Sequence, residues 1–262
     1  MADTPNRDDL PDSAMSLADH LDELRRRLIL SIAGLVIAII FCFFFGKQII
    51  AFIEKPYIAS MGASARLQVL SPAEGFTSYM QVAGVSGIIL ASPWIFYQLW
   101  MFVSAGLYSR ERRYVYMAVP FSAVLFIAGT MLFFFLIAPL TLQFFVYFNR
   151  EFLGVDSNFT FPNYISFMAI MMLIFGLAFQ TPIAIFFLIK TGLVSIKAIR
   201  KIRRYVILGV VVIAAAVIPG SDPFSLFATV IPMYLLFELG ILLGYISERK
   251  KTKSEDSEYK NV

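Results

Sequence analysis

The chain has 262 residues, of which 59% are hydrophobic and only 15% are charged, and its mean hydropathy is +0.75. A water-soluble domain cannot bury that much apolar surface, so the composition excludes an ordinary soluble protein and indicates an all-α integral membrane protein. The formal net charge of +4 does not indicate a nucleic-acid partner, because the basic residues border apolar segments and do not gather on one surface.

Residues 1–27 precede the first apolar segment, and we expect them to form a cytoplasmic N-terminal tail that contains an interfacial amphipathic helix. Leu17, Leu21, Leu24 and Leu28 would share one face of this helix, and charged side chains occupy the opposite face. This pattern is typical of a helix that lies at the lipid surface before the chain turns into the membrane.

Residues 28–247 are expected to form a bundle of six transmembrane helices. Long segments without charged side chains recur here, and most are near the length that crosses about 30 Å of hydrocarbon. The hairpin of the last two helices is predicted to be short. Its first helix has only about fourteen residues between Arg204 and the turn at residues 219–223, and these reach only about 21 Å. The predicted spans are approximately 28–46, 75–104, 114–139, 162–189, 205–218 and 224–246.

Pro93 and Pro182 lie inside predicted spans, where we expect each to kink the helix or to break one of its hydrogen bonds. The segment 47–72 is predicted to be an external loop with a short amphipathic piece around residues 49–57. Residues 248–262 are predicted to be a charged cytoplasmic tail without regular structure, because they are rich in charge and lack apolar periodicity.

The distribution of basic residues predicts the orientation of the chain. If the N-terminus is cytoplasmic, only four of the 22 lysines and arginines fall on the outer side, namely Lys47, Lys55, Arg66 and Arg150. Basic residues gather on the cytoplasmic side of membrane proteins. Six spans with both termini in the cytoplasm follow from this distribution.

The sequence offers no catalytic constellation. It contains one histidine, His20, and one cysteine, Cys42, and it has neither a nucleophile elbow nor a glycine-rich phosphate loop. We therefore expect the protein not to be an enzyme and to need no cofactor or metal.

Four polar residues have both a structural and a functional interpretation. Glu23 can pair with Arg27 one helical turn later, and Glu111 can balance the arginines beside it. Both acids also lie at the cytoplasmic ends of predicted spans, where a carboxylate can bind an incoming guanidinium. Gln180 and Glu238 lie within spans, where polar groups usually face the bundle interior and form interhelical hydrogen bonds.

Several separated blocks of the sequence resemble the successive signatures of the TatC family, the multispan subunits of the twin-arginine protein translocase. Any one block is weakly specific, but chance agreement of many blocks in the same order is improbable. The blocks are His20–Leu28, Ser92–Pro93, Tyr97–Trp100, Gly106–Tyr108, Glu111–Arg113, Phe175–Pro182, Arg203–Tyr205, Asp222–Ser225, Ile231–Tyr234 and Phe237–Glu238.

The resemblance implies a signal-peptide receptor and core subunit that exports folded proteins across the bacterial cytoplasmic (inner) membrane with the proton-motive force. It implies that Glu23 and Glu111 bind the paired arginines of the signal. Arg25 and Arg27 would orient Glu23 or contact lipid phosphate, and Pro56 would shape a periplasmic cap. The implied partners are the twin-arginine signal peptides of folded precursors, small single-span subunits of the TatA/TatB type, further copies of the chain and the lipid bilayer.

The resemblance also implies that Gln180 and Glu238 serve a transmembrane groove or a partner helix, with the apolar part of the signal entering near Gln180. That position is commonly glutamate in the family, so an amide here would act by hydrogen bonding instead of charge. The alternative function is secondary transport of a small solute, which proline-broken helices permit, although no internal repeat supports it. A membrane-embedded enzyme is less compatible, because the spans offer no pair of acids for the chemistry.

Overall fold

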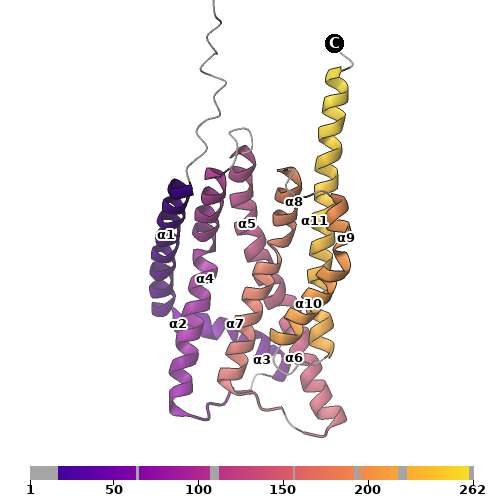
Figure 1. Ribbon diagram of the computed structural model, residues 1–262. Helices are drawn as coiled ribbons and strands as arrows, with labels where there is room; N and C mark the ends of the chain where they lie inside the picture. Colours follow the sequence, from indigo (N-terminus) through magenta and orange to yellow (C-terminus); the bar gives the residue numbers. More distant parts are fainter. Residues whose placement is uncertain are drawn as a thin grey trace, which may run out of the picture.

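The computed structural model describes residues 17–62, 65–106, 112–155, 157–191, 194, 196–217 and 223–259, and this part of the chain is almost entirely helical. The long helices lie side by side along one direction (Figure 1). In chain order the helices are α1 (Leu17–Phe44), α2 (Gly46–Ile53), α3 (Lys55–Met61), α4 (Pro72–Ala105), α5 (Arg112–Leu132), η2 (Phe133–Ile137), α6 (Ala138–Tyr147), η3 (Phe148–Phe152), α7 (Phe161–Ala178), α8 (Thr181–Lys190), α9 (Ile196–Lys201), α10 (Arg203–Val217) and α11 (Pro223–Tyr259).

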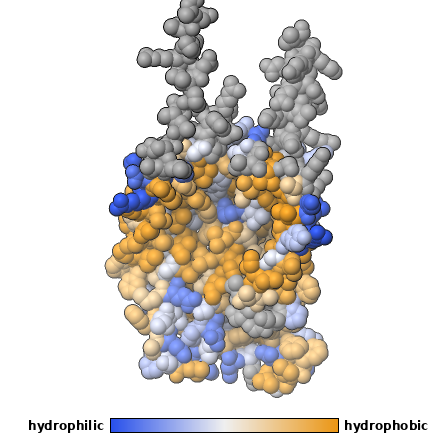
Figure 2. Space-filling model, in the orientation of Figure 1, coloured by the Kyte–Doolittle hydropathy of each residue, from blue (hydrophilic) through white to orange (hydrophobic). Residues whose placement is uncertain are grey.

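Five helical segments in the described residues are long and apolar enough to cross a membrane, so the chain is a multi-pass membrane protein. Apolar side chains cover most of the face seen in Figure 2, and hydrophilic ones gather towards its two ends. The fifth predicted span, 205–218, corresponds to α10, which has 15 residues and reaches only about 22 Å. The five long segments are His20–Phe44, Pro72–Ala105, Tyr114–Phe152, Phe161–Lys190 and Leu226–Tyr245.

The first and third spans are longer than the sequence predicted. Helix α1 runs without a break from Leu17 to Phe44, so the expected interfacial helix and the first span are one helix. The third helical segment continues past residue 139 to Phe152, because Pro139 is accommodated next to the π-helical turn η2 instead of ending the helix. Gly154, with φ of 65°, follows shortly after and suits the left-handed conformation that ends helices.

Pro93 and Pro182 have different consequences. Helix α4 continues through Pro93, and the hydroxyl of Ser92 donates to the Ile89 carbonyl at 2.7 Å, the carbonyl that the proline leaves without its usual donor. The predicted span 162–189 corresponds to the segment Phe161–Lys190, which is divided into two helices, because the chain turns at Phe179 and Gln180 before α8 begins with Pro182 in its first turn.

Helix α11 does not end where the last span was expected to end. It continues from the apolar segment to Tyr259, so the prediction of an irregular tail from residue 248 is wrong over this range. The segment contains neither glycine nor proline and is rich in lysine and glutamate, which are good helix formers, so an existing helix can propagate through it. Figure 1 shows the end of α11 on the same side of the bundle as the start of α1.

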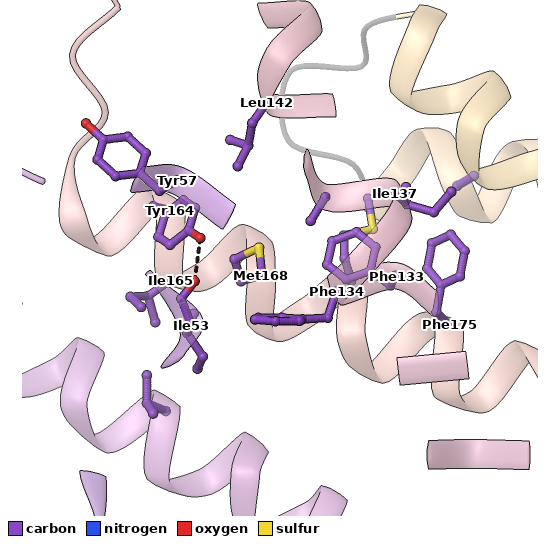
Figure 3. Close-up of a cluster of buried hydrophobic side chains, with 14 residues drawn as sticks. Ile53, Tyr57, Phe133, Phe134, Ile137, Leu142, Tyr164, Ile165, Met168 and Phe175 are labelled. Carbon is purple, nitrogen blue, oxygen red and sulfur yellow. Dashed lines mark hydrogen bonds between the residues drawn. The ribbon is translucent and has the colours of Figure 1, made fainter. Parts of the chain in front are cut away.

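Helices α2 and α3, here called the cap, lie in the half of the bundle away from the start of α1, and α4, α6 and α7 reach beyond them (Figure 1). The two helices occupy much of the segment 47–72, which the sequence predicted to be an external loop with a short amphipathic piece around residues 49–57. Tyr164 of α7 donates its hydroxyl hydrogen to the carbonyl of Ile53 at 2.6 Å, and Tyr57 packs against the same tyrosine ring (Figure 3). Phe133 and Phe175 extend this buried cluster into the bundle.

Helix α1 lies antiparallel on α4, and glycines allow the two helices to approach closely. A Cβ atom at Gly87 of α4 would come within 2.8 Å of the Ile39 Cα, and one at Gly34 of α1 would overlap the indole of Trp94. Since real Cβ atoms do not approach other atoms so closely, larger residues there would push the helices apart. The start of α1 is thereby fixed beside the end of α4.

Candidate functional site at the start of α1

The start of α1 and the end of α4 meet through an aromatic contact. The imidazole of His20 stacks on the ring of Phe102, with the ring centroids 4.6 Å apart. Gly106, at the end of α4, lies close to the same imidazole, where an added Cβ would be 3.6 Å from the ring. The connection from α4 to α5 therefore begins next to the helical turn that carries His20 and Glu23.

Glu23 is held in place by a short chain of hydrogen bonds between the two helices. Arg27 Nε donates to Glu23 Oε1 at 2.7 Å, and Arg27 Nη1 donates to Gln98 Oε1 at 3.0 Å. The side chain of Glu23 is 19% exposed, so its carboxylate is partly desolvated but still open to a ligand. A charge-assisted bond to a guanidinium is stronger in such a setting than on an open surface.

Arg25 does not take part in this arrangement. Successive residues of an α-helix are about 100° apart, so Arg25 lies on nearly the opposite face of α1 from both Glu23 and Arg27. Its side chain is exposed. Of the two predicted orienting arginines, the structure therefore places Arg27 against Glu23 and leaves Arg25 facing outward.

Glu111 lies outside the described residues, which resume at Arg112 with the start of α5. Its flanking helices are placed, and the α4 end of the connection lies beside His20. The pairing of Glu23 with Glu111 in one site stays a prediction.

Gln180 takes part in a polar contact that links three helices. Its Nε2 donates to the Ser122 carbonyl of α5 at 2.9 Å, and the indole of Trp100 in α4 donates to the Ser122 hydroxyl at 2.7 Å. The amide is only partly buried. This contact agrees with the structural interpretation of Gln180, because the side chain ties the α7–α8 turn to α5.

Glu238 is paired within the chain. Arg203 Nη2 of α10 lies 2.6 Å from Glu238 Oε2, and the Tyr234 hydroxyl donates to Glu238 Oε1 at 2.7 Å. Both oxygens of this carboxylate are thus engaged, and the bonds join the short helix α10 to α11. Gln180 and Glu238 belong to two separate polar contacts.

Pro56 lies in the first turn of α3 and is buried in the cap. Proline suits this position because its backbone lacks the N–H that would have no helical partner there. Its carbonyl accepts a hydrogen bond from Ser60 at 2.9 Å. Pro56 therefore lies at the start of α3, and its role in shaping a periplasmic cap stays a prediction.

Comparison with known proteins supplies the family. The family model described as Sec-independent protein translocase protein (TatC) matches residues 19–232. The chain belongs to the TatC family. It is 32% identical to the TatC protein of Desulforapulum autotrophicum, over 93% of this chain and 89% of that one, and 36% identical to the chloroplastic TATC of Arabidopsis thaliana, over 92% and 68%.

The TatC fold is shown by a solved structure as well. A crystal structure described as the twin arginine translocase receptor TatC superposes with a TM-score of 0.79 at 33% identity, and the match covers 87% of this chain and 99% of that one. The predicted resemblance is thereby confirmed. TatC proteins are translocase subunits, so this member of the family is a transport protein and not an enzyme.

In this TatC protein three contacting residues were missed by reasoning from the sequence. Gln98 and Arg203 stood in the recognised blocks without an assigned role, and Ser122 was not singled out. The sequence did contain one indication for Gln98, because its amide lies in a long segment without charged residues. A polar side chain inside a membrane usually has a hydrogen-bond partner. No pattern in the sequence identifies Arg27 as that partner.

Proposed function

We propose that this chain is the signal-peptide receptor subunit of a twin-arginine translocase and that Glu23 binds an arginine of the signal. The observation that carries the proposal is the partly exposed Glu23 carboxylate, fixed by Arg27 and Gln98 at the end of the α1–α4 pair. Membership of the TatC family supports the same function.

A fixed carboxylate favours arginine over lysine for a geometric reason. The guanidinium is a planar fork whose N–H groups match carboxylate oxygens, whereas an ammonium is a compact charge without that geometry. Glu111 is the second acid of the proposed site, and in the sequence it is the last residue of the connection that begins beside His20. Two acids on one face would select two successive arginines.

The membrane arrangement of the proposal has six crossings, with α10 and the start of α11 as a short hairpin and both termini in the cytoplasm of a bacterial cell. The start of α1 and the end of α11 lie on the same side of the bundle, which supports an even number of crossings (Figure 1). The short α10 would require locally thinned lipid or a lower rim of the bundle. Folded precursors would cross with the proton-motive force.

The proposed partners follow from the same family. After the arginine pair binds, the apolar part of the signal would lie along the exposed bundle surface near Gln180. Small single-span subunits of the TatA/TatB type and further copies of the chain would then assemble around it. The hydrogen bond of Gln180 to Ser122 leaves this residue able to act as a neutral polar contact in that surface.

The binding test uses the purified full-length chain in detergent and a fluorescent twin-arginine signal peptide. Glu23→Gln keeps the shape of the side chain and removes its charge, and Asp22→Asn is the matched control, because Asp22 is an exposed neighbour on α1. We expect Glu23→Gln to raise the Kd about tenfold or more, since a lost charge-assisted contact costs about 1.5–3 kcal/mol. Equal Kd values for both variants and the wild type would refute the role of Glu23.

A further inference from the structure

Arg27 is held from two directions by residues of different helices. Its Nε contacts Glu23 on its own helix, while its Nη1 contacts Gln98 on α4. Gln98 is 1% exposed, whereas the side chains of Glu23 and Arg27 are 19% and 20% exposed. The buried amide of Gln98 therefore anchors Arg27, and the carboxylate of Glu23 is the group that solvent or a ligand can reach.

We propose that Gln98 is a positioning residue for signal recognition: by anchoring Arg27, it holds the Glu23 carboxylate in the orientation that selects arginine over lysine. This inference rests on the proposed receptor function. Without Gln98, Arg27 is left with a partner one turn away on the same helix, and such a pair permits several rotamers of both long side chains. A carboxylate without a fixed orientation attracts a cation mainly through its charge, and lysine can then bind it as well as arginine does.

The amide of Gln98 has the chemistry that this task requires. It accepts a hydrogen bond without a negative charge, so it anchors the guanidinium and leaves the charge of Arg27 to Glu23. A carboxylate at position 98 would compete with Glu23 for the same guanidinium. An apolar side chain would leave Nη1 without its acceptor, and the guanidinium would move towards water.

The test measures the Kd values of two fluorescent signal peptides, one with Arg-Arg and one with Lys-Lys, for the full-length chain in detergent. For Gln98→Met we expect the Arg-Arg peptide to bind about three- to tenfold more weakly, which corresponds to the cost of ordering one long side chain. The Lys-Lys peptide should change less than twofold, so the preference for arginine falls. Gln98→Asn, whose amide is one methylene shorter, should give the same loss.

Gln81→Met is the matched control. Gln81 lies on the same helix, roughly 25 Å from Gln98, and its Oε1 accepts a hydrogen bond from Ser166 at 3.0 Å. Its replacement removes one hydrogen bond between an amide of α4 and another helix, and it should leave the ratio of the two Kd values unchanged. A merely structural role of Gln98 would weaken both peptides equally or would lower the thermal unfolding midpoint without changing the ratio.

A double variant shows whether Gln98 acts through Arg27. If it does, Gln98→Met added to Arg27→Met changes the Kd ratio no further, and a further loss would overturn the proposal. If Glu23→Gln abolishes the preference for arginine while Gln98→Met and Gln98→Asn keep it, the inference is wrong and the receptor function stands. If the wild type shows no preference for Arg-Arg and Glu23→Gln changes nothing, the proposed function itself fails.

Discussion

The indole nitrogen of Trp94 donates a hydrogen bond to the carbonyl oxygen of Leu30 at 2.9 Å, and its ring lies directly against Gly34. This contact joins α4 to α1 one turn beyond Arg27. The proposed recognition site therefore depends on a packing contact between two helices as well as on charge.

We predict that Gly34→Val separates α1 from α4, because a Cβ at this position would overlap the indole of Trp94. Overpacking of this kind costs about 1–3 kcal/mol of stability, and the signal peptide should bind more weakly. Thermal unfolding and peptide binding of the purified variant measure both effects. Gly84→Val is the control on α4, because a Cβ there meets no atom within 4 Å, and equal destabilisation by both changes would contradict the packing account.

The pair of Arg203 and Glu238 is predicted to stabilise the α10–α11 hairpin. Because the two side chains are 42% and 29% exposed, we expect Arg203→Met or Glu238→Leu to cost only about 1–2 kcal/mol. The double variant should cost less than the sum of the two single changes, since each single change leaves one charge without its partner. Additive losses in the thermal unfolding of the three variants would show that the pair contributes nothing.

Gln180→Glu is predicted to destabilise the bundle. The Gln180 amide donates to a carbonyl, and an ionised carboxylate would face that oxygen with a second acceptor. We expect a loss of about 1–2 kcal/mol in thermal unfolding at neutral pH. Gln143→Glu, at an exposed position on α6, is the control, and equal effects of the two substitutions would argue against the hydrogen bond.

A pH-dependent prediction concerns the cap. Burial raises the pKa of the Glu54 carboxyl, at the junction of α2 and α3, above its ordinary value of 4.5. Folding therefore favours the protonated form, so this group stabilises the fold below its ordinary pKa and loses that contribution as the pH rises through the folded value. Glu54→Gln should raise the unfolding midpoint at pH 7 and have little effect at pH 4. A stabilisation that is larger at pH 4 would contradict this sign.

The helical spans were largely predictable because their determinant is local: uninterrupted apolar sequence long enough to cross a bilayer. The errors lie where the result depends on the surroundings. Whether a proline breaks a helix depends on a neighbouring donor such as Ser92 or on a π-helical turn such as η2, and neither is visible in composition. The helical end of α11 depends on an existing helix that a charged segment can extend.

The candidate site was predictable only in part. Glu23 and Arg27 are four residues apart on one helix, so their contact follows from helical geometry. The contact of Arg27 with Gln98 joins residues that are far apart in the sequence, and it depends on the register of α1 against α4. That register is fixed by the fit of Gly34 and Gly87 to their neighbours, which no local pattern reveals.

The most direct test of the central claim is site-specific photocrosslinking of a signal peptide to membranes that contain this protein. The comparison uses an Arg-Arg and a Lys-Lys signal, each with the wild type, Glu23→Gln and Glu111→Ala, and with photoreactive groups placed next to Glu23 and Glu111. We predict crosslinks with the Arg-Arg signal and the wild type that are strongly reduced by either substitution or by the Lys-Lys signal. Equal crosslinking in all six combinations would contradict recognition by these carboxylates.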